Sequence, residues 1–351
     1  MDKIFWNGKT VLITGHTGFK GSWLTLWLKK LGSRVIGFSK DIPTTPSLFE
    51  LADVANGINS IQGDIRNFNQ IQQVIKNTEP EIIFHMAAQS LVRTSYENPR
   101  ETYETNVMGT INLLDAIRDS KKTRVVINVT SDKCYENKEL DRPYVEEDPL
   151  GGYDPYSSSK ACSELVSSAF RNSYFQENNH TISLSSVRAG NVIGGGDWAK
   201  DRLIPDFIQS LEDNRTLKIR NPDAIRPWQY VLEPLSGYLQ LAEKMWFNGK
   251  IFAQAWNFGP NEESKKVSWI INKISNMYGK QIGILSDKSD NLHEAKILNL
   301  DCSKSQTKLN WIPKTNIEKG LEMTVNWYKE YQKKSNMKEV SEKQIEYFNS
   351  I

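Results

Sequence analysis

The sequence has few cysteines and few histidines. Of its 351 residues, three are cysteines and four are histidines. An odd number of scattered cysteines excludes a disulfide framework and indicates a reducing compartment. The histidines lack the spacing of metal ligands, so we expect no metal site. The cysteines are Cys134, Cys162 and Cys302, and the histidines are His16, His85, His180 and His293.

The sequence also lacks a large excess of charge of either sign and any long apolar run. Its 44 basic and 42 acidic residues are interspersed, so we expect neither a nucleic-acid partner nor a membrane surface. No apolar stretch reaches the length that spans a bilayer, and the first nine residues contain no apolar segment of a secretion signal. These features predict a cytoplasmic protein.

A strand, a glycine-rich turn and a helix follow one another near the N-terminus. Residues 9–14 form a short apolar run, glycines follow at 15, 18 and 21, and apolar residues then recur at helical spacing until Gly32. This context favours a dinucleotide site, in which the glycines allow a tight turn, a close approach of pyrophosphate and helix packing. A phosphate-binding P-loop is excluded because Phe19 replaces the glycine before the lysine. The predicted contacts of this turn are Gly15, Thr17, Gly18, Phe19, Lys20 and Gly21.

The ends of the next three strands supply further candidates for cofactor binding. Ser39, Lys40 and Asp41 follow the strand 34–38 and favour neither NAD nor NADP, because an acidic residue there indicates NAD and a basic one NADP. Asp64 follows the strand 59–62 and suits either an adenine edge or a helix cap. The other candidates, near these ends or in the helix from Pro99, are Ile65, Ala87, Ala88, Gln89 and Asn106.

The residues that predict chemistry lie after the fifth strand, 124–128. Ser131 and Asp132 come at its carboxyl end, where open α/β sheets bind ligands. Tyr156 and Lys160 then open a helix four residues apart, which places them on one face, one turn apart. We expect the lysine charge to lower the pKa of the phenol from about 10 by a unit or two, making the pair a proton-transfer device.

The order of these elements predicts a Rossmann-type α/β fold, a doubly wound parallel sheet with right-handed crossovers. Beyond residue 188 the pattern becomes irregular, which predicts a smaller, mixed α/β domain that binds substrate. We expect an NAD-binding domain over 1–188 and a substrate domain over 189–351, with the segment around 226–247 returning to the first. In this second half, Arg226 and nearby aromatic residues suit a phosphate and a base, or else a surface ion pair and a core Trp.

Four motifs in register resemble the extended short-chain dehydrogenase/reductase family over the first two hundred residues. They are Thr14-Gly-x-x-Gly-x-x-Gly21, Asn106-Val-x-Gly-Thr110, Ser131-Asp132 and Tyr156-x-x-x-Lys160. Within that family, the segment Ser131-Asp-x-x-Tyr135 resembles the nucleotide-sugar 4,6-dehydratases, which carry their dehydration residues there. Five further segments resemble the members that act on CDP-hexoses. They are 15–23, 43–49, 131–137, 152–156 and 194–198.

One position departs from the wider dehydratase group. Related dTDP-glucose and GDP-mannose enzymes carry a glutamate after the aspartate as the base for the C5 proton, whereas this chain has Lys133. A lysine acts as a base only when neutral, which requires burial or a nearby cation. By resemblance, Lys133 takes the C5 proton or polarises the 4-ketone, or another group takes that proton.

The resemblance implies NAD as a tightly bound, recycled cofactor, without excluding NADP, and a CDP-hexose substrate. A 4-epimerase or a dehydratase of another nucleotide sugar is the alternative. The family also implies a homodimer or homotetramer. The implied catalytic residues are Ser131, Asp132, Lys133, Tyr156 and Lys160, and the implied substrate contacts are Ser90, Arg188, Asn191 and Arg226.

Overall fold

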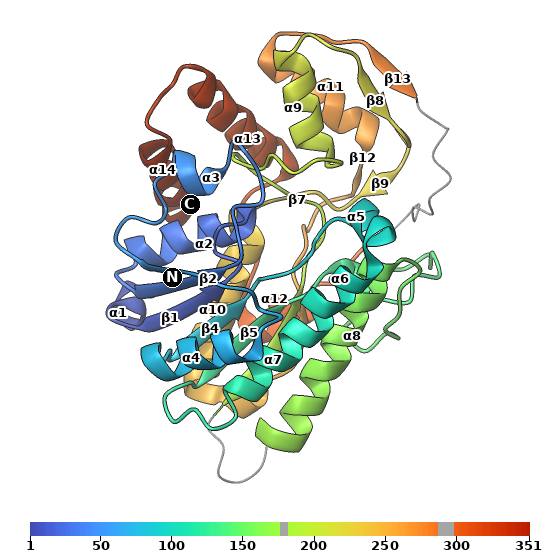
Figure 1. Ribbon diagram of the computed structural model, residues 1–351. Helices are drawn as coiled ribbons and strands as arrows, with labels where there is room; N and C mark the ends of the chain where they lie inside the picture. Colours follow the sequence, from blue (N-terminus) through green and yellow to red (C-terminus); the bar gives the residue numbers. More distant parts are fainter. Residues whose placement is uncertain (176–181, 287–297) are drawn as a thin grey trace.

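The computed structural model describes residues 1–175, 182–286 and 298–351. A seven-stranded parallel sheet lies at the centre, with helices on both faces (Figure 1). The strand order is β11-β6-β5-β4-β1-β2-β3. The bounds are β1 Thr10–Thr14, β2 Arg34–Ser39, β3 Asn59–Gln62, β4 Ile82–His85, β5 Val125–Val129, β6 Ser183–Arg188 and β11 Ala255–Asn257. The predicted doubly wound α/β fold is confirmed.

The order in which the chain adds strands to the sheet reverses at β1. The chain adds β2 and then β3 on one side of β1, and it continues with β4 on the other side. In this register Thr14, the last residue of β1, lies between Phe38 of β2 and His85 of β4. Such a switch point leaves a crevice at the carboxyl ends of the strands, which is where open α/β sheets bind ligands.

Side chains of β1 alternate between two apolar cores. Val11 and Ile13 pack with the helices of one face, whereas Leu12 packs with those of the other. Because both faces are covered, the strand reads as a continuous apolar run. The first face carries α2 (Phe19–Lys30) and α10 (Leu232–Phe252, kinked at Asn248), and the second carries α4 (Phe68–Thr78) and α7 (Gly109–Ala116).

The helix predicted from Pro99 contains a π turn. It consists of α6 (Pro99–Tyr103), the π turn η1 (Glu104–Met108) and α7. A π turn inside a helix often marks a functional position, and this one contains Asn106. The neighbouring helices are α5 (Val92–Glu97), α8 (Pro155–Phe170) and the π turn η3 (Arg171–Phe175).

A smaller module lies beyond the carboxyl ends of the strands, at the top of Figure 1. It contains short strand pairs and two helices: β7 (Val192–Ile193) with β10 (Gln229–Tyr230), β8 (Leu217–Ile219) with β13 (Ile284–Ser286), β9 (Ile225–Arg226) with β12 (Lys265–Lys266), α9 (Leu203–Glu212) and α11 (Val267–Tyr278). Between β10 and β12 the chain passes back to the main sheet, because α10 packs on β5 and β6, and β11 pairs with β6. The residue limits of two domains stay a prediction.

The remaining helices complete the outer layer. They are α1 (Lys3–Trp6), α3 (Leu48–Leu51), the 3₁₀ turn η2 (Asp132–Cys134), α12 (Ser303–Leu309), α13 (Ile317–Gln332) and α14 (Met337–Ser350). The last helix packs on α2, where the rings of Trp27 and Phe348 lie 5.6 Å apart. Within the three described ranges, no helix combines the length and the apolar character needed to cross a membrane.

Candidate active site

The turn after β1 brings main chain to the switch point. Gly15 has φ = +77°, and a Cβ there would lie 2.7 Å from the amide nitrogen of Ala87. A Cβ on Gly21 would lie 2.1 Å from the carbonyl oxygen of Gly15, so α2 packs directly on the turn. Gly18 is the N-cap of α2, and no side chain in the described part of the chain caps it. The first-turn N–H groups of α2 are therefore open to an anion such as a pyrophosphate.

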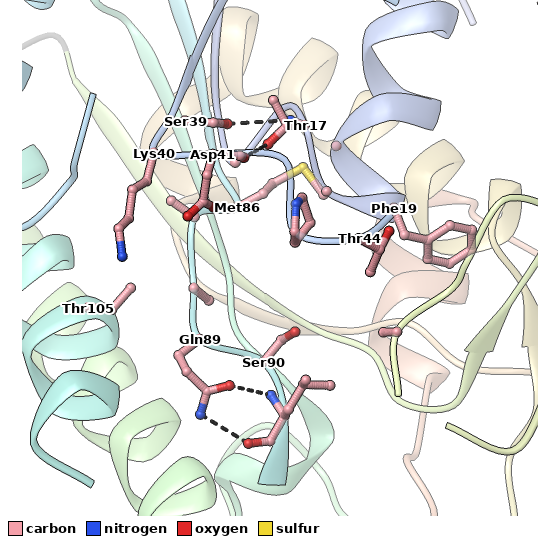
Figure 2. Close-up of a pocket in the computed structure, with 18 of the residues that line it drawn as sticks. Thr17, Phe19, Ser39, Lys40, Asp41, Thr44, Met86, Gln89, Ser90 and Thr105 are labelled. Atoms are coloured by element: carbon pink, nitrogen blue, oxygen red, sulfur yellow. Dashed lines mark hydrogen bonds between the residues drawn. The ribbon is translucent and has the colours of Figure 1, made fainter. Parts of the chain in front are cut away.

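A groove of about 930 Å³ lies over this turn. Figure 2 shows Thr17, Ser39 and Asp41 on one side of it and Gln89 and Ser90 on the other. The groove brings together most of the predicted cofactor contacts. Those that line it are Gly15, Thr17, Gly18, Phe19, Lys20, Gly21, Ser39, Asp64, Ile65, Ala87, Ala88, Gln89, Tyr156 and Lys160.

Asn106 lies behind the groove and positions its wall. Its Oδ1 accepts a hydrogen bond from the Gln89 backbone N–H, and its Nδ2 donates to the Gln89 carbonyl, both at 2.9 Å. It also donates to Ser159 at 2.8 Å and is only 2% exposed. Thr14 secures the same loop, because its Oγ1 accepts the backbone N–H groups of Met86 and Ala87. The sequence analysis named Thr14 as the first residue of the glycine motif but gave it no role.

Asp64, after β3, and Ser39, at the end of β2, were both predicted to contact the cofactor, and each has partners within the protein. Asp64 forms an ion pair with Arg66 at 2.6 Å, whose hydrogen bond lowers the pKa of Asp64. The helix-cap alternative for Asp64 is wrong, because Asn67 caps α4. Ser39 contacts the ring of His16 at 2.8 Å and accepts from the backbone of Thr17. These contacts shape the rim of the groove.

Tyr156 lies where the groove meets a second cavity of about 380 Å³. The N-cap Asp154, which accepts from Ser157 N–H, and Pro155 at the first helical position place Tyr156 in the first turn of α8. The Tyr156 backbone N–H donates to Ser95 at 3.1 Å. Lys160 follows one turn later, and its Nζ donates to the Val129 carbonyl at 3.2 Å. The predicted pairing of the two residues on one face at a ligand groove is present.

The expected lowering of the phenol pKa is wrong for this state of the protein. Burial raises the pKa of Tyr156 to about 12, against a hydrogen bond with Ser131 and the charge of Arg202, which lower it. Burial and the charge of Lys20 lower the pKa of Lys160 to about 7. The physical reason is that both groups lose their hydration, so the lysine is only partly charged near neutral pH.

Asp132 is a buried carboxyl that lines the second cavity together with Tyr156. It is 3% exposed and accepts a hydrogen bond from Ser131 Oγ at 3.0 Å. Its charge opposes ionisation of Tyr156, which places the two groups within electrostatic reach. The backbone of Gly190 lies against it so closely that a Cβ would be 1.8 Å from Asp132 Oδ2. The Asp132 carboxyl is thus held in a fixed place in the cavity that Tyr156 also lines.

Lys133 also lines the second cavity, but its side chain is exposed. Its backbone N–H donates to Ser131 Oγ at 3.2 Å. This bond fixes the backbone of the turn and does not fix the position of the Lys133 ammonium group. Its role in removing the C5 proton stays a prediction.

The second cavity extends from Tyr156 into the smaller module. Its lining combines the catalytic candidates with residues of α9, β8 and β9. Three of the four predicted substrate contacts line it, namely Ser90, Asn191 and Arg226. Arg226 Nη1 donates to the Ile225 carbonyl at 2.9 Å. The position of these residues agrees with a ligand that spans both modules.

Arg188, the fourth predicted substrate contact, is a correction. Its guanidinium is 2% exposed and forms an ion pair with Glu164 at 2.9 Å. It also donates to the Tyr135 hydroxyl and to the Glu146 carbonyl. Since these bonds occupy the group inside the core, Arg188 cannot contact a ligand. Its position at the end of a strand suggested a binding role, but β6 is an inner strand, and this end is covered.

Arg202 and Asp197 are site residues that the sequence analysis missed. Arg202 lines both cavities and donates to Asp197 at 2.8 Å and to Ser90 Oγ at 3.1 Å. The Asp197 charge raises the pKa of Arg202, and Arg202 in turn lowers the pKa of Lys20. Burial is the larger cause and brings the pKa of Lys20 to about 8. The signal was present, because Asp197 belongs to the Gly-rich segment 194–198.

The histidines within the described residues have structural partners. Burial lowers the pKa of His16 to about 4 and that of His85 to about 3. His85 bonds with Thr14 and Thr110. His180 and His293 lie outside the described residues, and no group of acidic, histidine or cysteine side chains within those residues could hold a metal ion.

Comparisons with known proteins agree with this architecture. A family model described as GDP-mannose 4,6 dehydratase matches residues 12–324. A CDP-glucose 4,6-dehydratase from Salmonella typhimurium is 51% identical over 349 residues, which cover 98% of this chain and 97% of that protein. A dTDP-glucose 4,6-dehydratase from Haemophilus influenzae is 26% identical over 91% of this chain and 97% of its own.

Solved structures share the fold at lower identity. A dTDP-glucose 4,6-dehydratase from Streptomyces venezuelae, with NAD and TYD bound, has a TM-score of 0.77 at 23% identity and covers 93% of this chain and 98% of its own. A UDP-glucose 4-epimerase from Thermotoga maritima, with UDP-glucose, has a TM-score of 0.79 at 20% identity, covering 92% and 99%. The shared fold therefore serves more than one reaction.

Proposed function

Because the chain belongs to the GDP-mannose 4,6-dehydratase family, we propose that it converts CDP-D-glucose to CDP-4-dehydro-6-deoxy-D-glucose and water. The Salmonella typhimurium relative, named CDP-glucose 4,6-dehydratase, supports the choice of substrate. The observation that carries the proposal is the buried Asp132 carboxyl, which lines the second cavity together with Tyr156, the residue at which the two cavities meet. The product would serve deoxysugar biosynthesis.

The proposed cofactor is NAD, held in the groove of about 930 Å³. The groove suits a dinucleotide because Gly18 leaves room for a pyrophosphate at the open N-terminus of α2, and Ala87 and Ala88 are small. The bound dinucleotides named for related structures support NAD rather than NADP. When bound, NAD+ would accept a hydride from C4 of the hexose and return it to C6.

In the first step, Tyr156 Oη takes the proton of the sugar O4 as C4 is oxidised. The Ser131 hydrogen bond and the Arg202 charge both favour the ionised phenol, although burial opposes them. Lys160, with a pKa lowered to about 7, is able to gain or lose a proton near neutral pH. In this proposal the Tyr156 phenol, the Ser131 hydroxyl and the Lys160 amine act together in proton transfer.

In the second step, Asp132 protonates the departing 6-hydroxyl while a base removes the C5 proton. The new 4-ketone makes that proton acidic. Lys133, which lines the same cavity, is the proposed group for removing it or for stabilising the enolate. If Lys133→Ala eliminated water at the full rate, with C5 exchange from D2O unchanged, this role would be excluded.

Arg226 and Asn191 are the proposed contacts of the nucleotide diphosphate, and Ser90 lies between the cofactor and the sugar. All three line the second cavity, and Arg202 holds the hydroxyl of Ser90. Guanidinium groups form charge-assisted hydrogen bonds to phosphate oxygens, which suits Arg226 to this task. Arg188 has no part in this proposal.

The experiment is to incubate the purified protein with CDP-, dTDP-, UDP- and GDP-hexoses without added cofactor. We expect CDP-glucose to lose one water, as seen by mass spectrometry, because the hydride returns within each cycle. The main rival is a 4-epimerase, which shares the fold. An epimerised product of unchanged mass would overturn the proposal, as would a preference for another nucleotide.

A second copy of the chain is the proposed macromolecular partner. Tyr103, Met108 and Leu165 are exposed apolar side chains, 37%, 48% and 58% accessible, on α6, η1 and α8, which pack on one another. A shared apolar face of this kind suits a homodimer, and two dimers can pair into a tetramer. Light scattering of the wild type and of Leu165→Glu tests this, since the charge should shift the mass toward the monomer.

A cytoplasmic location is also part of the proposal. The three cysteines lie within the described residues and are free thiols. Free thiols, two of them buried, are expected in a reducing compartment.

A further inference from the structure

Where the second cavity extends into the smaller module, it has an apolar end. At this end α9 and β8 lie next to each other in the smaller module (Figure 1). The side chains that form its walls are mostly buried and apolar. They are Ile204, Leu217, Ile219, Trp228 and Val267, all at most 9% exposed. Such walls suit the faces of a planar ring.

The direction of a bound nucleotide sugar follows from the proposed function, on which this inference rests. The hexose must reach Tyr156 and Asp132, at the end that meets the groove. The cavity lining includes Arg202, Arg220 and Arg226, which suit a diphosphate. The base then lies at the apolar end, between α9 and β8.

The carboxylate of Asp206 lines this cavity from the first turn of α9. It is half-buried, and among residues 1–175, 182–286 and 298–351 its side-chain oxygens have neither a hydrogen bond nor an ion pair. Burial and then the charge of Asp201 raise its pKa to about 6, against Arg215 and Arg220. Asp206 is therefore mostly ionised above pH 7 and has capacity to accept hydrogen bonds.

An unpaired carboxylate is unfavourable in a cavity for a diphosphate unless the ligand brings a donor to it. Cytosine presents an exocyclic amine at C4, whereas uracil and thymine present a carbonyl oxygen there. A carboxylate attracts the amine and repels the carbonyl. We propose that Asp206 accepts a hydrogen bond from the exocyclic amine of cytosine and so selects CDP-sugars over UDP- and dTDP-sugars.

The test is Asp206→Asn, which keeps the size of the side chain. Its amide can accept from cytosine or donate to the O4 of uracil, so the preference for CDP-glucose over UDP-glucose should narrow. We expect the ratio of kcat/KM values for the two substrates to fall about 10-fold or more. Asp213→Asn is the matched control, because Asp213 is an exposed carboxylate at the end of the same helix, ion-paired with Arg215.

Calorimetric titration with CMP and UMP gives a second readout that needs no turnover. The variant should lose affinity for CMP relative to UMP, while Asp213→Asn keeps the wild-type ratio. An unchanged ratio in both measurements would overturn the inference, and so would equal losses for both nucleotides, which indicate a ribose contact. If the wild type dehydrates CDP-glucose and Asp206→Asn keeps the wild-type ratio of kcat/KM values, the inference about Asp206 is wrong and the proposed function stands. A wild type that does not dehydrate CDP-glucose sinks the proposed function.

Discussion

The dinucleotide groove and the substrate cavity meet at Tyr156, but different elements line them: the loops after β1 to β4 line the groove, and α9, β8 and β9 line the cavity. Small residues such as Gly18 and Ala87 bring main chain to the wall of the groove, which charged side chains such as Asp41 and Arg66 also line. The substrate cavity carries ionisable side chains, including Asp132 and Asp206. We therefore expect the close approach of the backbone to contribute most to dinucleotide binding, and placed charges to contribute most to the reaction and the choice of substrate.

This contrast predicts two kinds of damage. In the cavity, replacing one atom of a side chain should stop a chemical step without loss of the fold. In the groove, adding a single methyl group should weaken cofactor binding, because the main chain itself is the binding surface. The expected effects decrease from the first prediction below to the last.

Tyr156→Phe should have the largest effect. The change removes the group that takes the O4 proton, so we expect kcat to fall by about 10²–10⁴-fold while NAD affinity changes little. Steady-state kinetics and calorimetric NAD binding measure the two quantities. Tyr153→Phe is the control, because Tyr153 is 77% exposed. A Tyr156→Phe enzyme with nearly full activity would remove the phenol from the mechanism.

Asp132→Asn should separate two chemical steps. The amide cannot protonate the 6-hydroxyl, so elimination should slow by about 10²-fold, whereas C4 oxidation continues. Reduced nicotinamide should then accumulate, which absorbance spectroscopy detects. Gly190→Ala should produce a similar defect, since its Cβ would overlap the Asp132 carboxyl. Equal slowing of oxidation and elimination would contradict the role of Asp132 as the acid.

Gly18→Ala and Gly21→Ala should both weaken NAD binding, but for different reasons. Gly18 has room for a Cβ in the protein, with its nearest contact at 3.4 Å, so the free energy of unfolding should fall by no more than about 1 kcal/mol. Gly21→Ala overlaps Gly15 and should cost about 1–3 kcal/mol or more. Denaturant unfolding and NAD titration measure both. Unchanged NAD affinity in Gly18→Ala would show that the pyrophosphate does not approach there.

Lys160 should make stability depend on pH in the absence of ligands. Its pKa is lowered to about 7 by burial, whereas an unfolded lysine titrates near 10.4. Between these values the unfolded chain binds more protons than the folded one, so this group's contribution to the free energy of unfolding should rise with pH. From pH 7 to 9 we expect a rise of about 1–2 kcal/mol from this group.

The comparison is between the wild type and Lys160→Met, in which the rise should be absent. Lys76→Met, on the exposed side of α4, is the control and should keep it. Denaturant unfolding at several pH values measures the slope. A slope that is the same in wild type and Lys160→Met would show that the amine stays charged in the folded protein.

The sequence predicted the elements of the site that depend on neighbours along the chain. The glycine turn before α2, the serine and aspartate after β5, and the Tyr156–Lys160 spacing are local patterns, and the structure has each of them where the sequence predicts it. The prediction that Arg188 contacts substrate was wrong because residues distant in the sequence, Tyr135 and Glu146, accept hydrogen bonds from its side chain at the end of β6. Arg202 was missed because nothing along the chain shows that a residue before α9 reaches Ser90, 112 positions away.

Sequence by itself determined the fold class, since a buried strand, a glycine turn and amphipathic helices follow from periodicity and from the space that a side chain needs. Tertiary structure decided the ionisation of the site. Burial moves the pKa of Tyr156 to about 12 and that of Lys160 to about 7. For the phenol this shift is opposite to the lowering that we predicted from the four-residue spacing. The reason is that hydration is lost through contacts from the whole molecule, and no short stretch of sequence records those contacts.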